Sequence, residues 1–286
     1  MLKILLSNDD GYDAPGLEVL FNTLKTFADL FVVAPEVNNS GAGCSITTNK
    51  PMRVTKRSNG FLSVTGKPAD CVYLGVHELA PWKPDLVISG INLGANMGED
   101  LLYSGTVGAA LEARDLLYPS IAISAAAFHQ PGSKDYMEPN YDTAANVVLD
   151  ILQNYDLNEI DPSIVLNINT PNVSFSNDLD YKVTSVGSWG PRNPPQVEKD
   201  KSVTVAYWTT HRDRYLKNEA NSDIKTLEEN LVSISPIFPN YTVNEITKQK
   251  ILLRKELNNR QIVDIDTLVQ VGGNSLQKKQ NKKKVY

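Results

Sequence analysis

Short apolar runs alternate with segments of helical spacing over the first 125 or so residues. Leu2–Leu6, broken only by Lys3, predicts a buried strand, and Gly16–Phe27 carries apolar residues three or four positions apart, as a helix does. The rhythm continues with strands predicted at 29–36, 86–89 and 119–126 and with helices after Gly66 and from Ser104. This repetition is typical of an α/β fold, here Rossmann-like, with a mostly parallel sheet flanked by helices.

The pattern changes after Pro171. Up to that point a helix is predicted at Asp142–Leu152 and a buried strand at 163–171, which completes an expected core of residues 1–171. Beyond it, "YKVTSVG", "KSVTVAYWTT" and "NLVSISPIF" predict strands without intervening helices, joined by the loops "GPRNPP" and "HRDRYLKNEANSD". We expect antiparallel hairpins or an extended arm over 172–275. The basic run at 276–286 predicts a disordered tail.

Composition gives no positive indication of function, but it argues against general binding to nucleic acid or membranes. The 286 residues are 41% hydrophobic and 21% charged, as in an ordinary globular protein, and the net charge of -5 offers no general attraction to nucleic acid or anionic membranes. No stretch approaches the roughly 20 apolar residues of a membrane helix. We expect no signal peptide, since the first apolar segment soon meets Asp9 and Asp10, and we therefore expect a cytoplasmic location by default.

Polar side chains follow several of the predicted strands. Asp9 and Asp10 come after the first strand, Ser40 after the second, and Asn92 and Asn96 after the third. Ligands of open parallel sheets bind beyond the carboxyl ends of the strands, so these side chains are expected to converge. Each residue alone also fits a cap or a turn. Together their hard oxygens suit Mg²⁺ or Mn²⁺, which would offset the repulsion between adjacent carboxylates.

A second feature is the start of the helix in "SGTVGAALEA". Ser104, Gly105 and Thr106 stand where free backbone N–H groups and the helix dipole favour a phosphate or carboxylate, although the hydroxyls also suit simple caps. Gly90 and Gly94 in the preceding loop would let the backbone approach a ligand closely. A cation beside an anion cradle at one sheet edge indicates phosphoryl chemistry.

Several ordered motifs resemble one known family. "ILLSNDDGYDAPG", "VVAPEVNNSGAGCSIT", "GKPADCVYLG", "PDLVISGINLGANMGEDLLYSGTVGAALEA" and "PSIAIS" resemble the SurE family of survival-protein nucleotidases, strongly over residues 1–125 and recognisably through "LNINTP" and "LVSISPI". The resemblance implies a metal-dependent phosphatase acting on nucleoside 5′- and 3′-monophosphates and, in some members, on short polyphosphate.

The resemblance also implies roles for individual residues. The ligands of one divalent cation would be Asp9, Asp10, Ser40 and Asn92, and the phosphate pocket would be lined by Asn96, Ser104, Gly105 and Thr106. It implies a C-terminal β-hairpin and helical arm, exchanged between subunits of a homodimer or homotetramer. Two segments depart from the family pattern: "GSWGPRNPPQ", and "GKPADC", where Lys67 replaces a threonine. Lys67 is either a surface lysine or, if its loop borders the substrate, a cation that favours a more anionic ligand.

The chemistry leaves alternatives open. Asp9 and Asp10 are the expected catalytic residues: they would hold the cation and orient its water, or one of them would attack directly and form an aspartyl-phosphate. A nucleotide-binding regulatory module without turnover is the rival outside catalysis, although "NDDG" is not a dinucleotide-binding GxGxxG motif. A haloacid-dehalogenase-like phosphotransferase is a second rival, but its DxD spacing is absent at residues 9–11.

Overall fold

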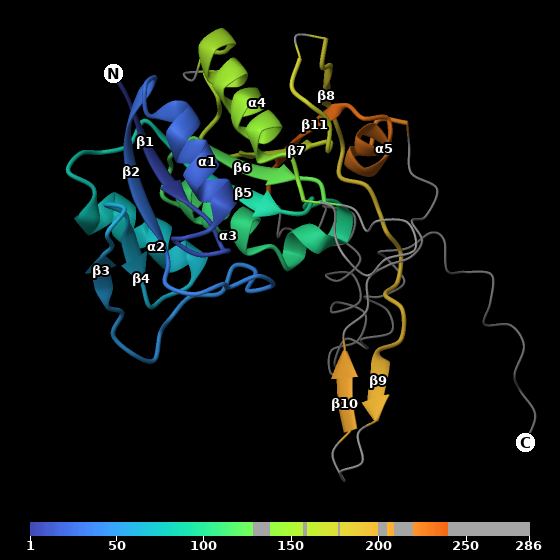
Figure 1. Ribbon diagram of the computed structural model, residues 1–286, viewed down its shortest axis with the longest axis horizontal. Helices are drawn as coiled ribbons and strands as arrows, with labels where there is room; N and C mark the ends of the chain where they lie inside the picture. Colours follow the sequence, from blue (N-terminus) through green and yellow to red (C-terminus); the bar gives the residue numbers. More distant parts are fainter. Residues whose placement is uncertain (128–137, 157–158, 177, 200–204, 209–219, 240–286) are drawn as a thin grey trace, which may run out of the picture. The chain divides into compact units, whose positions relative to one another are not determined.

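The computed structural model describes residues 1–127, 138–156, 159–176, 178–199, 205–208 and 220–239. Their main feature is a nine-stranded sheet in the order β3-β4-β2-β1-β5-β6-β7-β11-β8, with β9 and β10 paired separately (Figure 1). Pairing is parallel throughout the sheet except for β3 with β4 and β7 with β11. The strands are β1 Leu2–Ser7, β2 Ala28–Pro35, β3 Val54–Lys56, β4 Leu62–Val64, β5 Leu86–Leu93, β6 Ser120–Ala125, β7 Val165–Thr170, β8 Tyr181–Val183, β9 Gln196–Lys199, β10 Val205–Trp208 and β11 Val232–Ile237.

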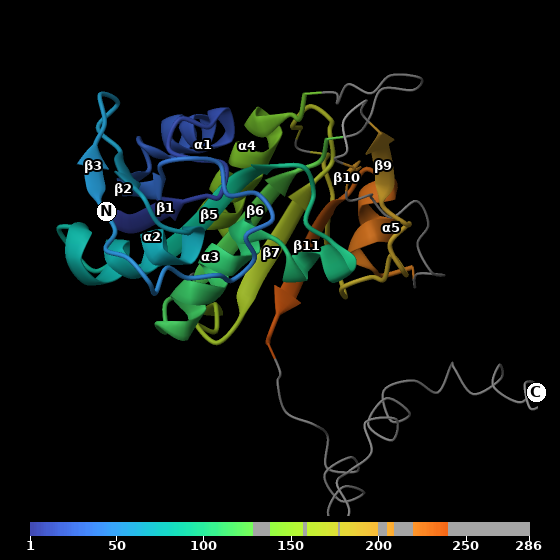
Figure 2. The same ribbon diagram turned by 90° about the horizontal axis from the view of Figure 1, so that it is seen from below.

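Helices cover both faces of the sheet, as Figure 2 shows edge-on. Alternate residues of β1 serve the two sides: Ile4 and Leu6 pack in the core beneath α1 and α4, and Leu5 packs in the core beneath α2 and α3. The described helices are α1 Pro15–Leu24, α2 Pro68–Leu74, α3 Gly105–Asp115, α4 Tyr141–Asn154 and α5 Asp223–Glu228, with a π-helical turn at Gly75–Leu79 and a 3-10 turn at Gly98–Leu102. The expected α/β fold with a mostly parallel sheet is confirmed.

The strand order creates a switch point between β1 and β5. From β1 the chain moves outward to β2 on one side and later continues through β5, β6 and β7 on the other. The loops that leave β1 and β5 therefore lead to helices on opposite faces, α1 and α3, and such a switch point is where ligands of open α/β sheets bind. Asp9, Asp10 and the Asn92 region lie at this position.

A β-bulge changes the direction of β5 near its carboxyl end. The pairing of β5 with β6 shifts in register between Ser89 and Asn92, and Gly90 adopts φ +138°. A side chain at Gly90 would place its Cβ 2.2 Å from the carbonyl oxygen of Ile123 on β6. Only glycine allows this close approach, and the bulge lets the strand continue to Leu93 instead of ending at Ser89 as predicted.

The region after Pro171 differs from the prediction at α5, at β9, which was not predicted, and in the parallel pairing of β8 with β11. Helix α5 lies between the strands, so the expectation of strands without intervening helices is wrong at Asp223–Glu228. Six residues show too little periodicity to be recognised; the side-chain cap from Ser222 and the burial of Ile224 and Leu227 stabilise this helix. β9 and β10 form an antiparallel pair, while β8 and β11 extend the main sheet. The part of the predicted arm after residue 239 and the predicted tail at 276–286 lie outside the described residues.

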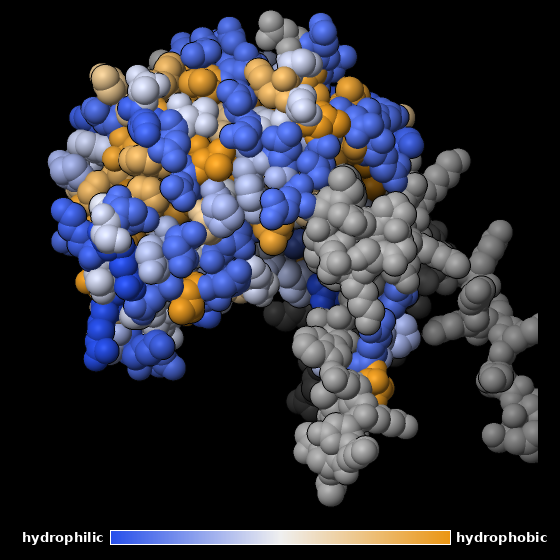
Figure 3. All heavy atoms as spheres, in the orientation of Figure 1, coloured by the Kyte–Doolittle hydropathy of each residue, from blue (hydrophilic) through white to orange (hydrophobic). Residues whose placement is uncertain are grey.

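The surface seen in Figure 3 is largely hydrophilic, with hydrophobic residues in small groups among polar ones. Within the part of the chain that the structure describes, no helix combines the length and apolar character needed to cross a membrane.

Replacement of Gly90 by alanine tests the bulge. Gly60, in the turn between β3 and β4, is the matched control, because it also has a positive φ (+87°) but has open space around its Cα. We expect Gly60→Ala to cost about 1–2 kcal/mol through backbone strain alone, and Gly90→Ala to cost about 4 kcal/mol or more because the clash with Ile123 is added. Urea unfolding measures both, and equal costs would contradict the close approach.

Candidate functional site

Asp9 is buried at the carboxyl end of β1 and held from two directions. Its side-chain oxygen Oδ1 accepts a hydrogen bond of 2.5 Å from the Thr106 hydroxyl at the start of α3. Its backbone carbonyl accepts a bond of 2.7 Å from the N–H of Asn39 in the loop after β2. Gly105 packs so closely that an added Cβ would lie 2.7 Å from the Cβ of Asp9. The helix start and the carboxylate are therefore in direct contact.

Asp10 is held by groups from two other loops. Its Oδ1 accepts hydrogen bonds from the Ser40 hydroxyl (3.3 Å) and the Asn38 amide (3.4 Å). Its Oδ2 accepts one from the backbone N–H of Leu93 (3.3 Å) at the end of β5. Three loops that are distant in sequence thus meet at the adjacent carboxylates, as the strand ends predict.

The side-chain nitrogen of Asn92 is hydrogen-bonded to the backbone of its own loop. Its Nδ2 donates to the carbonyl oxygens of Leu93 (3.3 Å) and Gly94 (2.8 Å). These bonds orient the side chain and leave Oδ1 as the atom suited to a ligand. The next residue, Leu93, is the one whose backbone N–H reaches Asp10.

Burial makes the charged forms of both carboxylates unfavourable. Desolvation raises the pKa of Asp9 from 3.8 to about 6; the Thr106 hydrogen bond lowers this pKa and repulsion by Asp10 raises it. Burial likewise raises the pKa of Asp10, against the lowering effects of its bonds to Leu93, Ser40 and Asn38. Among the ion pairs of the described residues, none joins a lysine or arginine to either carboxylate. Within the described part of the chain, neither carboxylate has a salt bridge to offset its charge.

This donor set fits a hard divalent cation. Two carboxylates, the Ser40 hydroxyl and the Asn92 amide oxygen are all oxygen donors, which Mg²⁺ and Mn²⁺ prefer. The described residues contain no group of three or more His, Cys, Asp or Glu side chains arranged for a metal. Such a cation would therefore depend on Asp9 and Asp10 for charge and on neutral oxygens and water for its remaining ligands.

The residues expected to bind phosphate lie around the start of α3. Ser104 is the N-cap of this helix, and its hydroxyl accepts a hydrogen bond from the N–H of Val107 (3.1 Å). Thr106 directs its hydroxyl to Asp9, as described above. Asn96 is buried and donates to the Ser124 hydroxyl (2.9 Å). Gly105 presents backbone. The structure thus places three of these four residues in structural contacts that shape the site.

Two asparagines of β7 support the loop after β5, and sequence reasoning missed both. Asn167 and Asn169 donate to the carbonyl oxygen of Asn96 (2.9 and 3.0 Å), and Asn169 accepts from its N–H (2.8 Å). Both are fully buried. Amides at alternate positions of a buried apolar strand are unfavourable without partners, so the "LNINT" pattern was itself a signal of a polar network.

A buried carboxylate braces the same loop from the C-terminal part of the core. Asp223 accepts hydrogen bonds from the backbone N–H groups of Gly98 (3.1 Å), Gly187 (2.7 Å) and Ile224 (2.8 Å). Trp189 adds a bond from its indole N–H to the carbonyl of Met97 (3.0 Å). The "GSW" segment, which departs from the family motifs, therefore has a positional role next to the site.

The sequence matches the model of one protein family. The model of the family described as survival protein SurE matches residues 4–193. The chain belongs to the SurE family. This confirms the resemblance drawn from the motifs.

Individual SurE relatives agree over most of the chain. The 5′-nucleotidase SurE of Idiomarina loihiensis is 39% identical over 247 residues, covering 86% of this chain and 96% of the relative. The 5′/3′-nucleotidase SurE of Yersinia pseudotuberculosis is 38% identical over 252 residues, covering 87% and 95%. The crystal structure of the SurE protein from Aquifex aeolicus superposes with a TM-score of 0.73 at 36% identity, covering 88% of this chain and 99% of that one.

The buried charge of Asp9 predicts how stability depends on pH in this SurE-family chain. Between about pH 3.8 and 6 the native Asp9 keeps a proton that the unfolded chain has released. The free energy of unfolding therefore falls as pH rises through this window, by about 2–3 kcal/mol. Urea unfolding in EDTA from pH 4 to 7 measures the fall. Asp9→Asn should reduce this fall, leaving the part that belongs to the other carboxylates whose pKa burial raises, namely Asp10, Glu112 and Asp223.

Asp29→Asn is the control, since Asp29 is an exposed carboxylate on β2. This variant should keep the wild-type fall. A fall of equal size in wild type and Asp9→Asn would show that Asp9 is not the group responsible.

Proposed function

We propose that this chain hydrolyses nucleoside 5′- and 3′-monophosphates to nucleoside and phosphate, with the help of a divalent cation. The observation that carries the proposal is the adjacent pair of carboxylates at the switch point. Asp9 is buried and contacts the start of α3, Asp10 is half-buried, and none of the described ion pairs brings a cationic side chain to either. Membership of a family whose compared relatives bear the names 5′-nucleotidase and 5′/3′-nucleotidase supports the reaction and the substrate class.

Four residues would hold the cation: Asp9, Asp10, Ser40 and Asn92. Mg²⁺ or Mn²⁺ in this position supplies a Lewis acid for a phosphate oxygen and lowers the pKa of a bound water. The hydrogen bonds from Thr106 to Asp9 and from Ser40 and Asn38 to Asp10 keep the carboxylates oriented. Fixed carboxylates of this kind suit ligation, and we therefore favour attack by water over attack by an aspartate.

The phosphate is proposed to lie at the start of α3. The positive end of the helix dipole lies next to Asp9, because Gly105 lets the helix start contact this carboxylate directly, and such a helix start favours an anion. Ser104 and Thr106 determine the shape of this turn through the cap and the bond to Asp9. Asn96 contributes the loop that closes the other side, held by Ser124 and the asparagines of β7.

Three further expectations accompany this proposal. Activity on short polyphosphate, a homodimer or homotetramer built through the C-terminal arm, and a cytoplasmic location all stay predictions. The residues assigned to the arm lie mostly outside the described part of the chain.

Phosphate release from a panel of nucleoside monophosphates tests the function. We expect no release in EDTA, restoration by Mg²⁺ or Mn²⁺, and a loss of about 100-fold or more in Asp9→Asn, because this variant removes a charged ligand. Asp29→Asn should retain activity. No release from any nucleotide with any metal would contradict the enzyme proposal and favour a nucleotide-binding module; a phosphoenzyme trapped at Asp9 or Asp10 would contradict attack by water.

Thr106 provides a graded test of how Asp9 is held. Thr106→Val keeps the shape of the side chain but removes the hydroxyl that donates to Asp9, so metal-restored kcat/KM should fall about 10- to 100-fold. Thr106→Ser retains the donor and should keep most of the activity. The apparent metal affinity, measured from activity against metal concentration, should weaken for Val and not for Ser. Equal behaviour of the two variants would show that the hydrogen bond is unimportant.

A further inference from the structure

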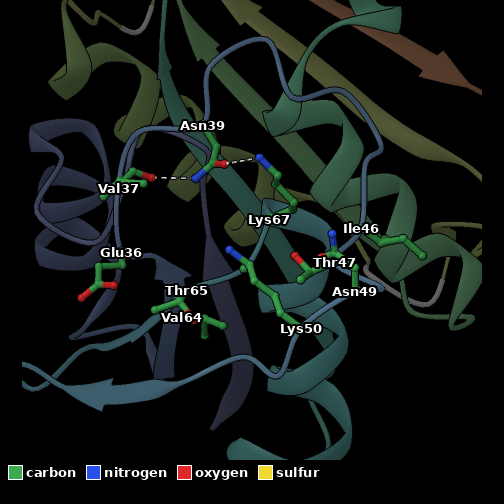
Figure 4. A pocket seen from close by; sticks show the side chains of 11 residues that line it. Glu36, Val37, Asn39, Ile46, Thr47, Asn49, Lys50, Val64, Thr65 and Lys67 are labelled. Carbon is green, nitrogen blue, oxygen red and sulfur yellow. Dashed lines mark hydrogen bonds between the residues drawn. The ribbon is translucent and has the colours of Figure 1, made fainter.

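A hollow of about 490 Å³ lies beside the loop that carries Ser40. It is formed by three segments: the residues after β2, the loop at 46–50, and the end of β4 with the turn into α2 (Figure 4). Its walls include Asn39, Lys50 and Lys67. The candidate catalytic residues do not line it, so it is a separate feature next to the site already described.

Asn39 connects this hollow to the carboxylate pair. Its backbone N–H donates to the carbonyl of Asp9 (2.7 Å), and its side-chain oxygen accepts from the Lys67 ammonium (3.0 Å). The next residue, Ser40, donates to Asp10. The hollow therefore lies one residue away from the candidate metal ligands, within the same loop.

Two lysine side chains line this space. In Figure 4 the ammonium group of Lys67 meets the side-chain oxygen of Asn39, and the side chain of Lys50 extends toward them from the loop below. Neither lysine takes part in an ion pair among the described residues. The carboxylate in the lining, Glu36, is paired with Arg57. Two lysines side by side create a local positive charge, which favours an anion from solution.

A buried carboxylate holds the two lysine-bearing segments together. Asp70 accepts hydrogen bonds from the backbone N–H of Thr47 (3.1 Å) and from that of Lys67 (2.7 Å). Asp70 is only 5% exposed, so these bonds are shielded from water. The carboxylate of Asp70 is therefore occupied by backbone N–H groups. Its hydrogen bonds fix the two loops that form the hollow.

We propose that this hollow binds a second phosphate group of the substrate, and that the chain prefers nucleoside 3′,5′-bisphosphates to monophosphates. This inference rests on the proposed function: one phosphate lies at the start of α3 and the other between Lys50 and Lys67. A phosphate monoester carries a charge of about -1.5 to -2 and several acceptor oxygens, which match two ammonium groups. Lys50 and Lys67 are thus specificity-determining residues, and Asn39 positions Lys67 relative to the metal loop.

The test compares kcat/KM for adenosine 3′,5′-bisphosphate and for AMP in one set of variants. In wild type we expect the ratio to be about 10 or more, by the strength of charge-assisted hydrogen bonds. Lys50→Gln and Lys67→Gln should each lower it several-fold, and the double variant should bring it close to 1. Lys83→Gln, an exposed lysine outside the hollow, should leave the ratio unchanged. A wild-type ratio near 1, or one that the double variant preserves, overturns the proposal.

Binding measurements separate this proposal from the proposed function. If neither substrate is hydrolysed, calorimetric titration of the same two nucleotides still reports the subsite: the bisphosphate must bind more tightly than AMP to wild type and equally to the double variant. Equal binding to wild type overturns the proposal. Inorganic phosphate is titrated as well. Phosphate binding that the double variant loses, with no preference for the bisphosphate, assigns the hollow to free phosphate and overturns the substrate assignment.

Discussion

Two neighbouring carboxylates, one buried and one half-buried, lie at the end of one strand, and the rest of the site is arranged around this constraint. Burial raises the pKa values of Asp9 and Asp10, and the ion pairs of the described residues bring no cationic side chain to them. Charge in such a place is unfavourable unless hydrogen bonds and an external cation compensate for it. The bonds from Thr106, Ser40, Asn38 and the Leu93 N–H supply the first part. The proposed metal supplies the second.

The same constraint explains why backbone comes so close at two positions. Gly105 allows the start of α3 to contact Asp9, and Gly90 allows β5 to bulge against β6 and continue toward Asp10. A side chain at either place would collide with atoms that the fold cannot easily move. The residues that form the site therefore lower the stability of the fold, because they make close backbone contacts and bury charge. A protein selected for stability alone would avoid both.

Buried polar residues farther out hold the surrounding loops in place. Asp70 ties the loop at 46–50 to the turn before α2, and Asp223 ties the loop after β5 to the C-terminal part of the core. Asn167 and Asn169 secure the backbone of Asn96. Each of these side chains satisfies backbone groups that would otherwise lack partners, which makes them rigid supports. The hydrogen bonds of Asp70 also fix the two segments that carry Lys50 and Lys67, and so the shape of the hollow.

Sequence alone determined the features that depend on local pattern. The apolar run of β1 followed by Asp9 and Asp10, the spacing of α1, and the start of α3 at Ser104 all follow from periodicity and capping, and the motif order led to the SurE family. Tertiary structure decided what depends on partners distant in the chain. That Thr106 holds Asp9, that Asp223 braces Gly98, and that Lys67 faces Asn39 are contacts across 97, 125 and 28 residues. Such pairs exist only once the sheet has assembled, because local spacing carries no information about which strand ends will meet.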